Sequence, residues 1–298
     1  MLPEVTRLHD VEAKSLLHGS GGLLGMNVYR GCSHGCIYCD SRSRCYGFNH
    51  AFEDIEVKRN APALLEAALK ARRKPCMIGT GSMSDPYMHC EAELGLTRRC
   101  LELICQYGFG AAIQTKSDRI LRDLDLLEAI HRQTKCVVQM TLTTWDPALC
   151  AIVEPRVCDT RRRLEVLAAL QARGIPTLVW LSPILPWIND TEENVRAILE
   201  ACAEVGVRGI VCFGMGLTLR EGDREYYYAA LDRHFPGLKA RYIRRYGNAY
   251  ELPSPDGGRL MALFHAFCEA RGMLHSPEAC FRWLAEFPER YQQTALPL

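Results

Sequence analysis

The sequence has 298 residues, 48% of them hydrophobic and 24% charged, enough to bury a sizeable core in one large domain or two small ones. Its formal net charge of +1 provides no overall basic field that would attract nucleic acid or an anionic membrane. The longest apolar stretch, residues 175–188, contains three prolines and is too short to span a bilayer, so we expect no membrane segment.

Fifteen cysteines are an unusual number for a chain of this length. Three lie close together at Cys32, Cys36 and Cys39, whereas most of the others are scattered singly. Residues 1–4 lack the basic-then-apolar pattern of a secretion signal. We therefore expect a cytoplasmic protein in which most thiols stay reduced and act as small core side chains.

Residues 1–21 have a mixed composition and are predicted to form an N-terminal arm. From residue 22 to residue 215, short apolar segments alternate with segments of helical periodicity. The apolar segments, each predicted to be a strand, are residues 23–28, 76–81, 110–115, 136–143, 175–184 and 209–213. The helices between them have predicted starts at Asn60, near Leu94, at Ser117 or Asp118, at Thr160, and at Asp190 or Thr191.

Apolar strands separated by amphipathic helices are typical of a parallel sheet that helices cover on its outer face. Their even spacing favours an α/β fold in which residues 22–215 form a partial (β/α)6 TIM-like barrel. After residue 215 the alternation stops, and helical patterns at residues 260–267 and 276–287 follow a segment rich in tyrosine and arginine. Residues 216–298 are therefore predicted to be a C-terminal helical extension packed on the barrel.

Polar side chains follow the predicted strands, where barrel enzymes place their chemistry. The three clustered cysteines follow the first strand. The segments that follow or end the next four strands are residues 80–86, 115–117, 141–146 and 183–190. This agreement across five strands indicates a site at one end of the barrel.

The three clustered cysteines predict a metal centre. A cubane iron–sulfur cluster is normally held by four thiolates, so three thiolates without an obvious fourth would leave one iron open to a substrate or cofactor. The alternative is a structural zinc site with Cys45 or His34 as the fourth ligand, which would leave the polar residues after the other strands unexplained. The sequence has no second cysteine cluster of comparable spacing, so we expect one cluster.

The spacing of these cysteines, with Tyr38 before the last of them, resembles the radical S-adenosylmethionine superfamily. Residues 22–215 are further similar to its spore photoproduct lyase-related branch, at residues 29–32, 79–80, 84–87, 115–117, 154–156 and 183–190. The resemblance implies a [4Fe–4S] cluster and S-adenosylmethionine, whose reductive cleavage gives methionine and a 5′-deoxyadenosyl radical that abstracts hydrogen from a substrate. It also implies a reducing electron donor such as flavodoxin or ferredoxin, and it leaves open whether the enzyme is a lyase or a transferase.

Carried onto this sequence, the resemblance assigns roles to individual residues. Cys32, Cys36 and Cys39 would hold the cluster, and Ser84 would contact the methionyl end of S-adenosylmethionine. Lys116 would pair with the carboxylate of that cofactor, which Thr141 would also serve. A lysine at a helix start is unfavourable for structure alone, which supports a functional Lys116.

Tyr38 and Arg156 are the candidate catalytic residues, although Arg156 could instead form a loop ion pair with Glu154. Two positions separate this chain from the lyase itself. Ser82 stands where the lyase has a thiol hydrogen donor, and Asp40 stands where it has a tyrosine after the last cluster cysteine. We therefore expect a relative that acts on another substrate.

The sequence leaves the substrate unidentified. A small molecule or peptide would need only a closed pocket, and the net charge favours this reading. A nucleic acid would bind through Arg241, Arg244 and Arg245 and the tyrosines around them. The alternative from another class is a non-catalytic iron–sulfur or zinc binding protein.

Overall fold

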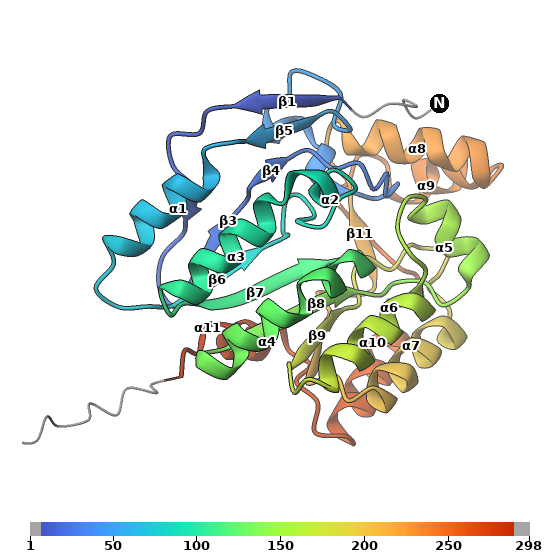
Figure 1. Cartoon of the computed structure of the whole chain (residues 1–298). Coiled ribbons are helices and arrows are strands. Elements are labelled where there is room, and N and C mark those ends of the chain that lie inside the picture. Colours follow the sequence, from blue (N-terminus) through green and yellow to red (C-terminus); the bar gives the residue numbers. More distant parts are fainter. Residues whose placement is uncertain (1–6, 289–298) are drawn as a thin grey trace, which may run out of the picture.

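A computed structural model describes residues 7–288 of the chain (Figure 1). The strands of its largest sheet are β2 (Leu17–His18), β3 (Leu23–Met26), β6 (Met77–Thr80), β7 (Gly110–Thr115), β8 (Cys136–Thr141), β9 (Thr177–Trp180) and β10 (Gly209–Val211). Their order is β10-β9-β8-β7-β6-β3-β2. Successive strands from β3 to β10 pair in parallel, and β2 pairs antiparallel with β3 at one edge. Parallel strands adjacent in chain order confirm the predicted partial barrel.

The helices between these strands cover the outer face of the sheet (Figure 1). They are α1 (Ala61–Lys70), α3 (Leu96–Gln106), α4 (Leu124–Gln133), α6 (Thr160–Gln171) and α7 (Glu192–Glu204). Their apolar sides share one buried core with outward-facing strand residues such as Ile78, Val138 and Ile210. Shorter elements lie in the connections: η1 (Asp40–Arg42), η2 (Arg44–Tyr46), α2 (Glu91–Leu94), η3 (Asp118–Asp123) and α5 (Pro147–Val153).

Most predicted helix starts agree with the structure. Thr191 caps α7 by accepting from the backbone N–H of Asn194, and Ser117 caps η3 in the same way. The predicted cap at Asn60 was wrong, although α1 does begin at the next residue. The Asn60 amide instead accepts from the backbone N–H of Ala13 and donates to its carbonyl, at 3.1 and 2.8 Å. This pairing satisfies both ends of the amide, whereas a cap would use one.

A smaller sheet lies beside the barrel, formed by β1 (Leu8–Val11), β4 (Tyr29–Arg30) and β5 (Ile55–Lys58) in the order β1-β5-β4. Residues 1–6 of the predicted N-terminal arm lie outside the described residues. The remainder of that arm supplies β1 and β2, one strand to each sheet. The division into arm, barrel and extension stays a prediction.

The C-terminal part contains helices α8 (Asp223–His234), α9 (Leu238–Tyr246), α10 (Gly257–Glu269) and α11 (Pro277–Ala285) and a pair of strands, β11 (Gly216–Thr218) and β12 (Glu251–Pro253). Helix α10 packs against α7. Helix α11 buries Cys280 and Leu284 against inward-facing strand residues, including Met77 and Val137. Helix α11 thus fills one end of the barrel interior, and the site lies at the other.

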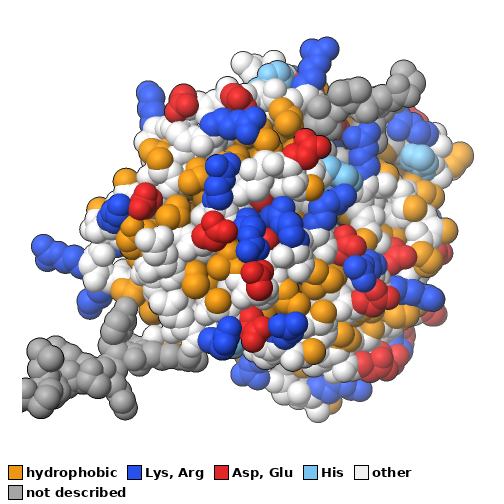
Figure 2. All heavy atoms as spheres, viewed as in Figure 1, with side chains coloured by type: hydrophobic (Ala, Val, Ile, Leu, Met, Phe, Trp, Pro, Cys, Tyr) orange, Lys and Arg blue, Asp and Glu red, His pale blue; other side chains and the backbone are white. Residues whose placement is uncertain are grey.

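Each helix within residues 7–288 is too short or too polar to traverse a bilayer. On the face drawn in Figure 2, basic and acidic side chains are interspersed, which agrees with the net charge of the chain.

Candidate active site

The three clustered cysteines lie on a loop that follows β4, and backbone contacts fix its course. The N–H of Cys32 donates to the carbonyl of Phe52 at 3.1 Å, and the N–H of Ile37 donates to the carbonyl of Val153 at 3.0 Å. Gly31 has a φ of +88°, and a Cβ there would lie 2.7 Å from the Phe52 carbonyl oxygen. The loop therefore requires glycine at this position.

All three cysteines line one cavity of about 90 Å³. The loop after β6, the end of β7 and the end of β8 form its other walls, through Ser84, Lys116 and Thr141. The structure therefore brings the predicted metal ligands and the predicted cofactor-binding residues to a single cavity. They meet because parallel strands end at the same edge of the barrel.

Asp85 ties the walls of this cavity together. Its carboxylate accepts from the backbone N–H of Tyr87, which caps the following turn, and from Thr115 Oγ1, both at 2.8 Å. It also accepts from the backbone N–H of Lys116 at 2.8 Å. Next to it, Ser84 Oγ donates to the carbonyl of Gly31 at 2.5 Å, which connects this loop to the cysteine loop.

Burial disfavours the charged form of the thiols in this cavity, so thiolates there need a cationic partner. Burial, with a smaller contribution from Asp85, raises the pKa of the Cys32 thiol to about 12, and burial raises the pKa of Cys36 further. Burial alone would lower the pKa of Lys116, but the sulfur of Cys36 and the carboxylate of Glu154 outweigh it and raise that pKa. Lys116 therefore holds a stable positive charge at the cavity wall.

The donor set fits an iron–sulfur cluster better than zinc. A single tetrahedral zinc with Zn–S bonds of about 2.3 Å would bring its ligand atoms to roughly 4 Å from one another. Within residues 7–288, the His, Cys, Asp or Glu ligand atoms that lie within 4.8 Å of one another in a group of three do not include the sulfurs of the cysteine loop. The three sulfur atoms are therefore farther apart than one zinc ion would hold them. Three thiols around one cavity leave room for the larger cubane, which they would hold through three of its four irons.

Behind the cysteine loop runs a buried polar chain. The Tyr38 hydroxyl donates to Glu154, and the other oxygen of Glu154 pairs with Arg163 Nη2 at 2.6 Å. Arg163 Nη1 donates to the carbonyl of Thr141 at 2.9 Å. Arg163 has none of its side chain exposed and Glu154 has 1%, so the pair is fully desolvated. It connects the cysteine loop to the end of β8.

Sequence reasoning did not single out Arg163, which lies in a run of three arginines. Its spacing to Val166, Leu167 and Leu170 on the buried side of α6 is the signal that could have identified it.

Arg156 lies close to the cysteine loop by its backbone, whose N–H donates to the carbonyl of His34 at 3.2 Å. It is not among the residues that line the two cavities described for residues 7–288, whereas Tyr38 lines the larger one. The Glu154 carboxylate, the ion-pair partner considered for Arg156, pairs with Arg163. Catalytic roles for Tyr38 and Arg156 stay predictions.

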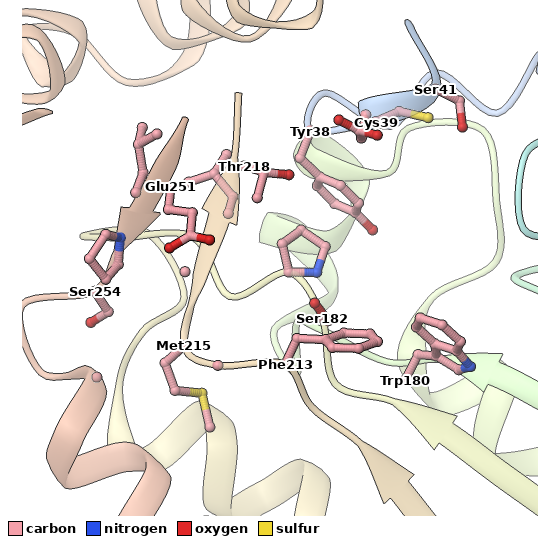
Figure 3. A pocket seen from close by; sticks show the side chains of 18 of the residues that line it. Tyr38, Cys39, Ser41, Trp180, Ser182, Phe213, Met215, Thr218, Glu251 and Ser254 are labelled. Atoms are coloured by element: carbon pink, nitrogen blue, oxygen red, sulfur yellow. The ribbon is translucent and has the colours of Figure 1, made fainter. Parts of the chain in front are cut away.

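A second cavity of about 680 Å³ adjoins the first (Figure 3). Both cavities are lined by Cys39, Ser41, Ser82, Met83, Gln114 and Lys116. The outer walls of the larger cavity come from the ends of β9 and β10 and from β11, β12 and the start of α10. Among its walls, Trp180 and Phe213 have ring centroids 5.7 Å apart, and Phe213 is 61% exposed. The volume is that of a typical small-ligand site.

The two positions that distinguish this chain from the lyase both line the larger cavity. Ser82 lines both cavities and so lies at their junction. Asp40 lines the larger one, where its carboxylate accepts from the hydroxyl of Tyr46 at 2.8 Å. The differences therefore fall where a substrate would approach the cysteine loop.

The Radical SAM superfamily pattern matches residues 26–202, more than half of the chain. The chain therefore belongs to the radical SAM superfamily and is a radical SAM enzyme, as the cysteine motif predicted. Enzymes of this superfamily use a [4Fe–4S] cluster and S-adenosylmethionine, and they need a reductant and a substrate.

Two relatives, each named an uncharacterized protein, are similar to this chain in sequence. One from Mycobacterium bovis is 30% identical over 259 residues, covering 82% of this chain and 75% of its own. One from Methanocaldococcus jannaschii is 31% identical over 169 residues, covering 56% and 62%.

Solved structures show the same fold at low sequence identity. A spore photoproduct lyase mutant with bound AdoMet and dinucleoside spore photoproduct has a TM-score of 0.63 and 13% identity, over 90% of this chain and 81% of its own. The radical S-adenosylmethionine methyltransferase TsrM from Kitasatospora setae, with tryptophan substrate and a SAM analog, has a TM-score of 0.53 and 16% identity, over 89% and 57%. Since one is a lyase and the other a methyltransferase, the fold leaves the reaction type open.

Proposed function

We propose that this enzyme cleaves S-adenosylmethionine at a [4Fe–4S] cluster held by Cys32, Cys36 and Cys39 and abstracts hydrogen from a substrate in the larger cavity. When bound, the cluster and S-adenosylmethionine supply one-electron cleavage of the sulfonium and a 5′-deoxyadenosyl radical. The observation that carries the proposal is that three thiols and three predicted cofactor-binding side chains line one cavity that adjoins a substrate-sized one.

The residues of the chain have separate roles in this proposal. The ammonium of Lys116 binds the carboxylate of S-adenosylmethionine, and the Ser84 and Thr141 hydroxyls bind its methionyl end. The pair of Glu154 and Arg163 fixes the backbone of Thr141 and the ring of Tyr38 in place. The walls of the two cavities keep water from the reacting carbon.

The walls of the larger cavity favour a compact substrate with an apolar ring. Its charged groups are Asp40, Lys116 and Glu251, which give no surplus of positive charge for a phosphate backbone. Two arginines outside this lining already have partners within the protein: the Arg220 guanidinium lies 3.6 Å from Asp40, and Arg241 stacks on Trp187 at 4.2 Å. We therefore favour a small molecule or peptide over a nucleic acid.

Phe213 and Trp180 are the surfaces on which such a ring would pack. The test compares free tryptophan, free tyrosine, short aromatic peptides and a single-stranded oligonucleotide as stimulators of 5′-deoxyadenosine formation. We expect an aromatic compound to stimulate and Phe213→Ala to reduce that stimulation about tenfold or more without changing the unstimulated rate. Ile243→Ala, an exposed apolar residue of α9 outside the cavity, is the matched control. Stimulation by the oligonucleotide alone would overturn the substrate class.

The state of the thiols concerns the cellular compartment of the protein, and the superfamily's need for a reductant concerns its electron donor. All fifteen cysteines are free thiols, which supports a reducing, cytoplasmic compartment. We propose reduced flavodoxin or ferredoxin as the electron donor. Anaerobic reduction of the reconstituted cluster by either protein, measured by electron paramagnetic resonance, tests this directly.

A further inference from the structure

A second group of side chains of the types that ligate metals lies outside the active-site cavity, where the smaller sheet meets the loop before β5. His9 of β1, His50 and Asp54 bring one ligand atom each to within 4.8 Å of one another. The strands β1 and β5 pair in parallel with His9 opposite Glu56, and this register places the three side chains together. None of them lines either of the cavities described above.

The His9 ring has an unused nitrogen that faces this group. Its Nε2 atom is buried, lacks a hydrogen-bond partner and lies 3.7 Å from Asp54 Oδ2, too far for a hydrogen bond. Its ring lies 5.1 Å from that of His50, at an angle of 33°. An imidazole nitrogen and a carboxylate oxygen at this separation are placed as two ligands of one ion would be.

One ring nitrogen of His50 makes a backbone hydrogen bond of the kind that orients metal-binding histidines. Its Nδ1 lies 2.9 Å from the carbonyl of Ala51, so Nδ1–H donates to that carbonyl. Metal-bound histidines usually donate their other ring N–H in this way. The remaining nitrogen, Nε2, faces a carboxylate oxygen of Glu56 at 3.1 Å, so either a proton or a cation must lie beside it. Glu56 itself is held by Arg30 Nη1 at 2.7 Å.

We propose that His9, His50 and Asp54 bind one divalent transition-metal ion, of which Zn²⁺ suits the ligands best. Two imidazole nitrogens and one carboxylate oxygen are a common zinc ligand set, with a fourth position left for water. The His9 side chain is 43% exposed, so the group lies near the surface of the protein.

The ion would have a structural effect on the active site. It would fasten β1 to residues 50–54, and the carbonyl of Phe52 in that segment accepts from the N–H of Cys32. Zinc at this site therefore supports the loop that carries the cysteines. Zinc binding at this site does not depend on whether the cluster cleaves S-adenosylmethionine, because the two sites use different residues.

The test uses the full chain with its cluster reconstituted anaerobically, then equilibrated with Zn²⁺ and freed of excess metal. We expect about one zinc and about four irons per chain by mass spectrometry. His50→Gln and His9→Gln should each weaken zinc binding more than about 100-fold, measured by chelator competition, while iron content is unchanged. His234→Gln, an exposed histidine of α8, should bind zinc as the wild type does.

Other outcomes decide against the proposal. Zinc that is absent from the wild type, or retained equally in His9→Gln and His50→Gln, would overturn it and favour a protonated His50 paired with Glu56. Loss of zinc in Cys36→Ala alone would also overturn it, because the zinc would then lie at the cysteines. Should a histidine variant fold poorly by circular dichroism, Asp54→Asn, which keeps an oxygen donor, replaces it in the same assay.

Discussion

Arg163→Met breaks the buried ion pair behind the cysteine loop. The substitution leaves Glu154, 1% exposed, without its cationic partner at 2.6 Å, and it removes the bond to the Thr141 carbonyl. Removing one partner of a buried pair typically costs about 3–5 kcal/mol, because the other charge stays desolvated. For a protein of this size we expect Tm to fall by roughly 10 °C.

The neighbouring Arg162 provides a matched control. It is 44% exposed and pairs with Asp118 at 2.9 Å and with Glu165 at 2.7 Å, contacts worth about 0–1 kcal/mol at a surface. Arg162→Met should therefore lower Tm by no more than about 3 °C. Anaerobic thermal unfolding followed by circular dichroism measures both variants. Equal shifts for the two arginines would refute the reasoning, and so would a double variant, Arg163→Met with Glu154→Gln, that is less stable than Arg163→Met alone.

Four further predictions follow from the site and its surroundings. Cys36→Ala should lose the cluster absorbance and all 5′-deoxyadenosine formation, and a variant that keeps both would show that this thiol is not a ligand. Lys116→Met should weaken S-adenosylmethionine binding by roughly 10- to 100-fold in an equilibrium titration, since it removes a charge-assisted contact; unchanged affinity would contradict its role. Gly81→Ala puts a Cβ 1.9 Å from the Gln114 carbonyl at a φ of +103°, and should destabilise by about 1–3 kcal/mol more than Gly95→Ala, which has a φ of +61° and open space. Burial, with the charge of Asp40 adding to it, raises the pKa of Asp223 to about 6. Between about pH 4 and pH 6 the native state therefore keeps a proton that the unfolded chain has released. The stability of the wild type relative to Asp223→Asn should thus fall as pH rises from about 4 to 6, leaving the variant more stable by about 1–3 kcal/mol at pH 7.5; a pH-independent difference in Tm would refute this.

The barrel could be predicted from the sequence because its signal is local. Buried parallel strands are continuously apolar, and the helices between them repeat at 3.6 residues. Parallel pairing then forces the strand ends together, so the sequence alone predicts that Cys32, Ser84 and Thr141 lie near one another. The short strands β1 and β2 gave no such signal, because two to four residues are too few to show alternation.

Features that depend on tertiary contacts could not be predicted in the same way. Asn60 has the side chain of a helix cap, but a distant backbone at Ala13 offers it two hydrogen bonds. Glu251 joins the wall of the larger cavity because β12 pairs with β11, although the paired residues are 33 to 37 positions apart in the chain. Local patterns contain no information about such docking, so the shape of the larger cavity could be known only from the structure.

The central claim is that this chain makes a deoxyadenosyl radical at the three-cysteine cavity. The most direct measurement is 5′-deoxyadenosine and methionine released from S-adenosylmethionine by anaerobically reconstituted protein under dithionite. We predict equal amounts of both products from the wild type and none from Cys36→Ala. Cluster-loaded wild-type protein that releases neither product would contradict the account.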